Sequence, residues 1–130
     1  MDAIIDYIKQ CLTSKYFRFR GRASRGEFWS LYIFVIISVL VGYTVFNEFN
    51  ALYKAEDGMM YLLIMVLVAA GLCYLVIPTI SATVRRLHDI GKSGWWILVS
   101  LIPSIGQIIL FILCLLPSEP YDNSYGRFER

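Results

Sequence analysis

The spacing of hydrophobic residues divides the chain into one short amphipathic stretch and three long apolar blocks. In residues 2–13 the apolar side chains recur along one helical face, and polar side chains occupy the other. Such a helix measures about 18 Å, which is less than the roughly 30 Å of a hydrocarbon core. We therefore predict an N-terminal amphipathic interfacial helix, with a soluble helix packed on the rest of the chain as the alternative.

The three apolar blocks are each long enough to cross a bilayer as a helix. They cover about 28–46, 59–83 and 95–116, and a polar tail over 117–130 follows them. No Asp, Glu, Lys or Arg lies within any block. The pattern predicts an all-α fold, an integral membrane helical bundle with three transmembrane helices in a single membrane domain over 1–130.

Proline and glycine mark the points where these helices should bend or end. Pro78 removes a backbone donor, so we expect a kink that frees the carbonyl of Tyr74. Gly91 suits the left-handed position that follows a helix end. Pro103 and Gly106 interrupt the third block, which is interpreted as one kinked helix, with a broken or re-entrant pair as the alternative.

Composition agrees with a membrane protein. Hydrophobic residues make up 58% and charged residues 17% of the chain, against about 45–50% and about 25% in a soluble domain. The three cysteines have no short spacing, which argues against a disulfide framework or a zinc site. The first residues lack the basic region and cleavage site of a signal peptide, so the first span is expected to direct insertion.

The distribution of Lys and Arg predicts the orientation. Six precede the first block, one lies in the first loop, three lie in the second loop and two lie in the tail. Because cytoplasmic loops carry the excess of these residues, the N-terminus of this multi-pass protein should be cytoplasmic. Three spans would place the tail outside, whereas a re-entrant third block would return it to the cytoplasm.

Charged residues gather in two stretches that this threading brings to one membrane face. Residues 15–27 interleave basic and aromatic side chains; the adjacent span favours a membrane interface over nucleic acid. Glu27 is expected to cap the first span with Ser24, to pair with an arginine, or both. Arg85 and Asp89 are four residues apart and are expected to pair. The predicted cluster comprises Arg22, Arg25, Glu27, Arg85, Arg86, His88, Asp89 and Lys92, with Trp29, Trp95 and Trp96 as interface anchors.

The cluster carries no recognisable catalytic or metal-binding pattern. His88 is the single histidine, and no nucleophile elbow, oxyanion hole or phosphate-cradling glycine loop accompanies it. We therefore expect no enzyme activity, no metal and no cofactor. A structural clasp, binding of anionic lipid headgroups, and a proton or solute path remain open for it. The favoured hypothesis is a non-enzymatic binding or scaffold module for anionic lipid, a second copy or another membrane protein; the alternative is a subunit of a small transporter or channel.

Several motifs also resemble a known family in order and spacing. They are residues 21–29 and 85–96, then Pro103 and Gly106, then the stretch 123–126. The chain resembles the domain-of-unknown-function 805 family, the YhaH-like small inner-membrane proteins of bacteria. The resemblance covers nearly all of the chain after residue 15. It implies a multi-span protein of the bacterial inner (plasma) membrane and supplies no established activity, substrate or cofactor.

Overall fold

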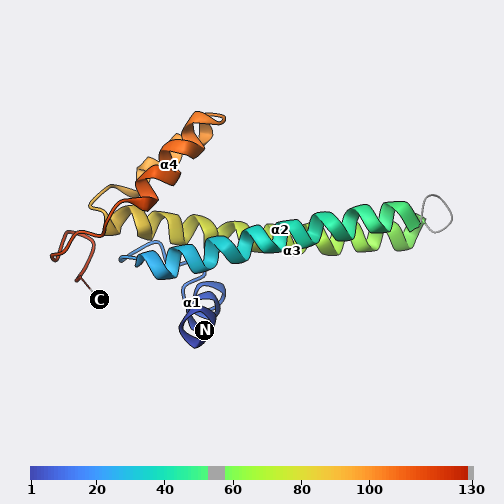
Figure 1. The fold of residues 1–130 in the computed structure, drawn as a ribbon, viewed down its shortest axis with the longest axis horizontal. Coiled ribbons are helices and arrows are strands. Elements are labelled where there is room, and N and C mark those ends of the chain that lie inside the picture. Colours follow the sequence, from blue (N-terminus) through green and yellow to red (C-terminus); the bar gives the residue numbers. More distant parts are fainter. Residues whose placement is uncertain (53–57, 129–130) are drawn as a thin grey trace.

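The fold is all-helical over the residues that the computed structural model describes, 1–52 and 58–128. Its elements are α1 (Asp2–Leu12), α2 (Arg25–Leu52), α3 (Gly58–Asp89), the 3₁₀-helix η1 (Gly94–Leu101) and α4 (Ile105–Leu115). The long helices α2 and α3 run antiparallel, and α1 lies across the start of α2 (Figure 1).

α2 and α3 are the first two predicted membrane helices, extended at their ends. At 1.5 Å per residue they measure about 42 and 48 Å, which exceeds a hydrocarbon core of about 30 Å. In the most apolar windows of α2 and α3, 11% and 6% of the residues are buried inside the protein. A core helix of a soluble domain would be largely buried, so these exposed apolar surfaces are those of membrane-spanning helices.

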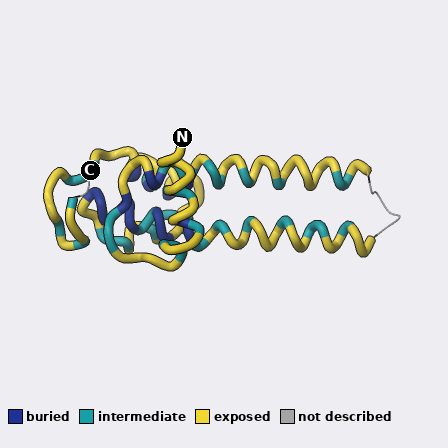
Figure 2. Tube along the Cα trace, turned by 90° about the horizontal axis from the view of Figure 1, so that it is seen from below, coloured by how far each residue is buried: buried dark blue, intermediate teal, exposed yellow. Residues whose placement is uncertain are grey.

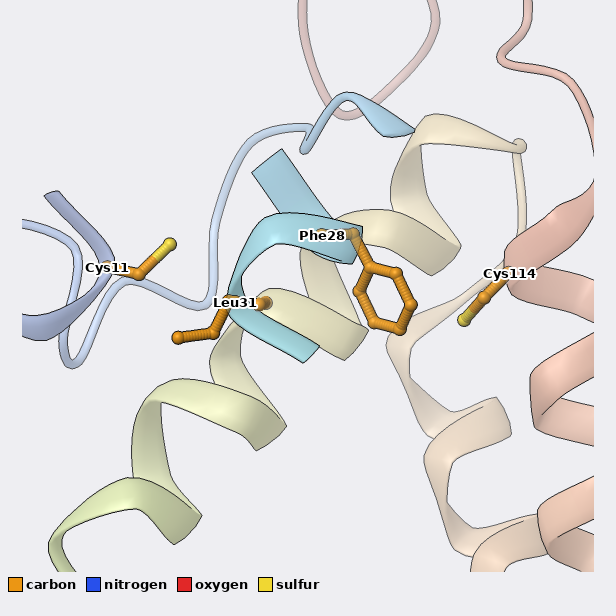
Figure 3. Close-up of a cluster of buried hydrophobic side chains, with 5 residues drawn as sticks. Cys11, Phe28, Leu31 and Cys114 are labelled. Carbon is orange, nitrogen blue, oxygen red and sulfur yellow. The ribbon is translucent and has the colours of Figure 1, made fainter. Parts of the chain in front are cut away.

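Burial is concentrated where α2 begins and α3 ends, and the two helices extend from this region with little cover (Figure 2). The largest apolar cluster draws residues from four elements: Cys11, Phe28, Leu31, Ala82 and Cys114. Figure 3 shows Phe28 of α2 between Leu31 and Cys114 of α4, with Cys11 of α1 beyond Leu31. This small core holds α1 and α4 against the paired helices.

The single third span predicted over 95–116 is not confirmed, and the alternative of a broken pair describes the structure better. η1 and α4 pack on each other and are joined by a tight turn at Ser104, whose φ is 62°. A Cβ on Gly106 would overlap the carbonyl oxygen of Val99, so glycine permits this close approach. Each segment measures about 16 Å, roughly half of a hydrocarbon core.

The predicted end of the second membrane helix is confirmed. α3 continues through the charged stretch to Asp89, and Gly91 follows it with φ 74°. Pro78 has no backbone N–H to donate to the carbonyl of Tyr74. That carbonyl instead accepts a hydrogen bond of 2.8 Å from the Tyr16 hydroxyl. The hydroxyl of buried Ser81 donates to the carbonyl of Arg18 at 2.6 Å. The segment before α2 is therefore fastened along α3.

α1 is present where the amphipathic pattern predicts a helix. Cys11 is fully buried against α2, whereas Ile4 and Ile5 remain 49% and 45% exposed. Part of the apolar face thus packs on the protein and part faces outward. This arrangement combines features of both alternatives drawn from the sequence.

Candidate functional site

Most of the charged residues in the described part of the chain lie at one end of the α2–α3 pair. We call this the charged end: residues 15–27, 85–92 and 117–128. The backbone N–H of Ala23 donates to the carbonyl of Arg85 at 3.1 Å and ties the first segment to α3. Ser24 caps α2 as predicted, because its hydroxyl accepts from the backbone N–H of Glu27 at 3.2 Å. These backbone contacts position the charged side chains.

Glu27 is the centre of the first group of charges. Its carboxylate pairs with the buried Arg85 and accepts from Lys15 Nζ at 3.2 Å. The predicted pair between Arg85 and Asp89 is therefore wrong: Arg85 faces α2, and Asp89 has other partners. The Cys11 Sγ lies 3.6 Å from the same carboxylate. Burial, followed by the negative charge of Glu27, raises the pKa of the Cys11 thiol.

Asp89 is the centre of the second group. It accepts from Arg22 Nε at 2.9 Å and from Arg86, which is fully buried and lies one helical turn before it. The hydroxyl of Ser118 donates to the same carboxylate. Since an unpaired buried charge is strongly unfavourable, Arg22, Arg86 and Asp89 depend on one another.

The two arginines of this group also bind backbone carbonyls of the C-terminal region. Arg22 donates to the carbonyls of Glu119 at 2.7 Å and Tyr121 at 2.8 Å. Arg86 donates to the carbonyl of Cys114 at 3.1 Å and to that of Leu116, where α4 leaves carbonyls without helical partners. The tail thus lies at the same end as the start of α2. The arrangement with the tail at the opposite end, expected for three spans, is not found.

His88 contacts the tail and does not pair with Asp89, because successive residues of a helix point in different directions. Its Nδ1 lies 3.1 Å from the carbonyl oxygen of Gly21. Its ring stacks on that of Tyr125, with centroids 4.0 Å apart and an interplanar angle of 1°. The side chain of Asn123 donates to the His88 carbonyl at 2.9 Å. These contacts fix the turn 123–126 beside the end of α3.

Some of the predicted residues lie outside the network. Arg25 is exposed and makes no ion pair within the described part of the chain, and Lys92 lies 5.8 Å from the centre of the Trp96 ring. Trp29 packs on Phe111 of α4, with centroids 5.4 Å apart, which gives it a structural contact. Trp95 is 77% exposed and Trp96 42%. Their role as interface anchors stays a prediction.

A basic cavity opens beside the two groups. It has a volume of about 590 Å³ and lies between α1, the segment before α2, the end of α3 and the tail. Sequence reasoning missed the four other basic residues of its wall as site members, although the basic stretch 15–27 and the turn at 123–126 were both visible signals. The missed residues are Lys15, Arg18, Arg20 and Arg127.

The chain matches the family described as "Protein of unknown function (DUF805)" over residues 16–127. The chain belongs to the DUF805 family. It is 32% identical over 111 residues to the "Inner membrane protein YhaI" of Escherichia coli (strain K12), a match that covers 85% of each chain. It is 30% identical over 123 residues to the "Inner membrane protein YhaH" of the same strain, covering 92% of each chain. No solved structure matches the chain.

Both relatives are named as inner membrane proteins, which agrees with the two exposed apolar helices of this chain. This DUF805 chain is an integral membrane protein. The matched residues include nearly the whole charged end, from Tyr16 to Arg127. In the described residues, no group of three or more His, Cys, Asp or Glu side chains could hold a metal ion. The chemistry that the site offers is that of guanidinium and ammonium groups toward an anion.

Proposed function

We propose that this DUF805 protein is a non-enzymatic binding module whose basic cavity holds the phosphate of an anionic lipid headgroup. One observation carries the proposal. The cavity wall contains six cationic side chains and two carboxylates, Glu27 and Asp89. The cations are Lys15, Arg18, Arg20, Arg22, Arg85 and Arg127. Basic pockets on the cytoplasmic side of membrane helices bind anionic lipid headgroups, and guanidinium groups bind phosphate in a bidentate manner.

The position of the cavity along α2 supports a lipid ligand, because it places the cavity at the level of the lipid headgroups. The helix from Leu52 back to Glu27 measures about 38 Å, roughly 8 Å more than a hydrocarbon core. If the far end of α2 lies at one interface, Glu27 lies at the headgroup level of the other. The nearby Phe17 and Phe19 are 70% and 41% exposed, as expected of rings that contact headgroups and upper acyl chains.

The proposed membrane arrangement follows from this level. α2 and α3 cross the inner membrane, and the excess of Lys and Arg places the charged end, with the N-terminus, in the cytoplasm. The exposed isoleucines of α1 enter the interface. η1 and α4 form a re-entrant hairpin, because neither half is long enough to cross and both ends of the segment 94–116 lie near the charged end: Gly94 lies beside His88, and the Leu116 carbonyl accepts from Arg86.

The proposal is tested by analysing lipids that remain bound to the purified full-length protein by native mass spectrometry. We expect retained anionic lipid in the wild type and its loss in a triple variant, Arg18→Gln with Arg20→Gln and Arg127→Gln. Arg25→Gln is the matched control, because Arg25 is exposed, lies at the same end of the protein as the first residue of α2, and does not line the cavity. Equal lipid retention in the wild type and the triple variant would refute the proposal. Arg85→Ala and Arg86→Ala are unsuitable probes, since both side chains are buried in ion pairs.

A subunit of a small transporter or channel is the second candidate, and the hairpin favours it. Broken helices often line the binding sites of transporters. A smaller cavity of about 220 Å³ lies between the hairpin and the long helices, and Thr79, Thr83, Ser100 and Gln107 contribute polar atoms to its mostly apolar wall. Solute flux into proteoliposomes that depends on Gln107 would support this candidate over the lipid-binding module.

A further inference from the structure

We infer that the basic cavity selects a phosphate ligand with two or more negative charges, held between the segment before α2 and the C-terminal tail. The inference rests on the proposed function and specifies its ligand. It follows from how the six cations are paired rather than from their number.

Half of these cations already have carboxylate partners. Lys15 and Arg85 share Glu27, and Arg22 pairs with Asp89. The other three, Arg18, Arg20 and Arg127, form no ion pair with any residue in the described ranges. The two internal carboxylates are therefore already engaged, and three guanidinium groups face one cavity without a counter-charge.

The charge of the ligand follows from this count. Each of the two carboxylates is shared by two cations, so the paired groups also keep a positive excess. A singly charged phosphate diester would leave at least two positive charges of the cavity wall uncompensated, and like charges repel. A phosphate monoester or a headgroup with two phosphates would compensate more of this excess charge. The Nε of buried Arg85, a cavity-lining residue, has no hydrogen-bond partner among the described residues. The cavity volume of about 590 Å³ lies within the range of small-ligand sites, about 300–1,000 Å³.

The three free cations come from opposite ends of the chain. Arg18 and Arg20 precede α2, and Arg127 follows the turn that stacks Tyr125 on His88. Tyr125, Gly126 and Arg127 together form the tail's part of the cavity wall. A ligand that binds all three guanidinium groups therefore also fastens the tail, and its binding should slow the exchange of tail amide protons.

The experiment is a lipid titration of the purified full-length protein by native mass spectrometry. The lipids are phosphatidylethanolamine, which is zwitterionic, phosphatidylglycerol, with one phosphate charge, and phosphatidic acid and cardiolipin, with more. We expect the last two to bind at least about tenfold more tightly than phosphatidylglycerol. Arg18→Gln, Arg20→Gln and Arg127→Gln should each weaken their binding by about fivefold, since a basic residue near the membrane surface contributes about this factor. Arg25→Gln should leave it unchanged.

The possible outcomes separate the inference from the proposed function. Equal affinity for phosphatidylglycerol, phosphatidic acid and cardiolipin, all above phosphatidylethanolamine, overturns the charge selection and leaves the lipid-binding module standing. If no anionic lipid is preferred and inorganic pyrophosphate also fails to bind, both the charge selection and the lipid-binding module are overturned. If pyrophosphate binds with the same arginine dependence while the lipids do not, the multiply charged phosphate is confirmed and the lipid source is refuted. Hydrogen exchange of residues 119–126 then tests whether the ligand fastens the tail. We expect the bound ligand to slow exchange in the wild type but not in Arg127→Gln. Unchanged exchange in the wild type would refute the contact between ligand and tail.

Discussion

The two ends of the α2–α3 pair are built on different principles. Toward Leu52 and Gly58 the helices expose long apolar side chains, and little of their surface is covered by the protein (Figure 2). At the charged end, Arg85, Arg86 and Asp89 are buried among fixed partners. The solvent explains the difference. Lipid satisfies an apolar surface without specific contacts, whereas a buried charge needs a defined partner at a defined distance. Substitutions at the charged end should therefore have large effects, and matched substitutions at the apolar end small ones.

The largest expected effect is that of Glu27→Gln. The substitution leaves Arg85 buried without an opposite charge, and breaking a buried ion pair in this way costs about 3–5 kcal/mol. Glu48→Gln is the matched control, because Glu48 is exposed near the other end of the same helix. Denaturant unfolding in detergent micelles should show a loss of stability for Glu27→Gln and little change for Glu48→Gln. Equal stabilities of the two variants would remove the distinction between the ends.

Gly106→Ala should have the next largest effect. The added methyl group would overlap a backbone carbonyl of η1, and the overpacking should cost about 1–3 kcal/mol. Gly71→Ala lies in α3, where the new Cβ meets no atom within 4 Å, so it should be neutral or stabilising. Thermal unfolding in micelles measures both. If Gly106→Ala is as stable as Gly71→Ala, η1 and α4 do not form the close hairpin that this glycine permits.

Arg22→Lys should loosen the tail without unfolding the helices. Lysine keeps the charge but lacks the planar fork that binds Asp89 and two tail carbonyls together. Losing about one charge-assisted hydrogen bond should speed amide exchange in residues 119–126 by roughly tenfold, as measured by mass spectrometry. Arg25→Lys is the control and should leave the exchange rates unchanged. Wild-type protection in Arg22→Lys would show that the charge alone holds the tail.

Tyr16→Phe should have the smallest effect. It removes the hydroxyl that satisfies the carbonyl freed by Pro78, and a hydrogen bond of this kind contributes about 0.6–1 kcal/mol. Tyr43→Phe, at an exposed site on α2, should cost nothing measurable. Steric-trap or denaturant measurements resolve differences of this size. A loss of several kcal/mol would mean that Tyr16 does more than satisfy one carbonyl.

Helices α1, α2 and α3 could be predicted from the sequence because their apolar residues recur over many turns and because Gly91 and Ser24 are strong end signals. The hairpin could not be chosen over one kinked helix, since Pro103 and Gly106 permit both. Most members of the charged network were predictable, although Arg25 and Lys92 lie outside it, but its pairing was not. Arg85 and Arg86 are adjacent, and only tertiary packing directs one to Glu27 and the other to Asp89. The basic cavity was missed because the tail was expected at the far end in the three-span interpretation.

The shared location of both termini is the claim on which the membrane arrangement depends. Reporters fused after Arg130 test it most directly: a fluorescent protein that folds only in the cytoplasm, and a phosphatase that is active only in the periplasm. A phosphatase inserted after Leu52 serves as the control for the opposite face and should be active. The account predicts fluorescence and no phosphatase activity for the fusions after Arg130. An active phosphatase and a dark fluorescent protein at that position would contradict it, because the tail would then lie across the membrane from the N-terminus.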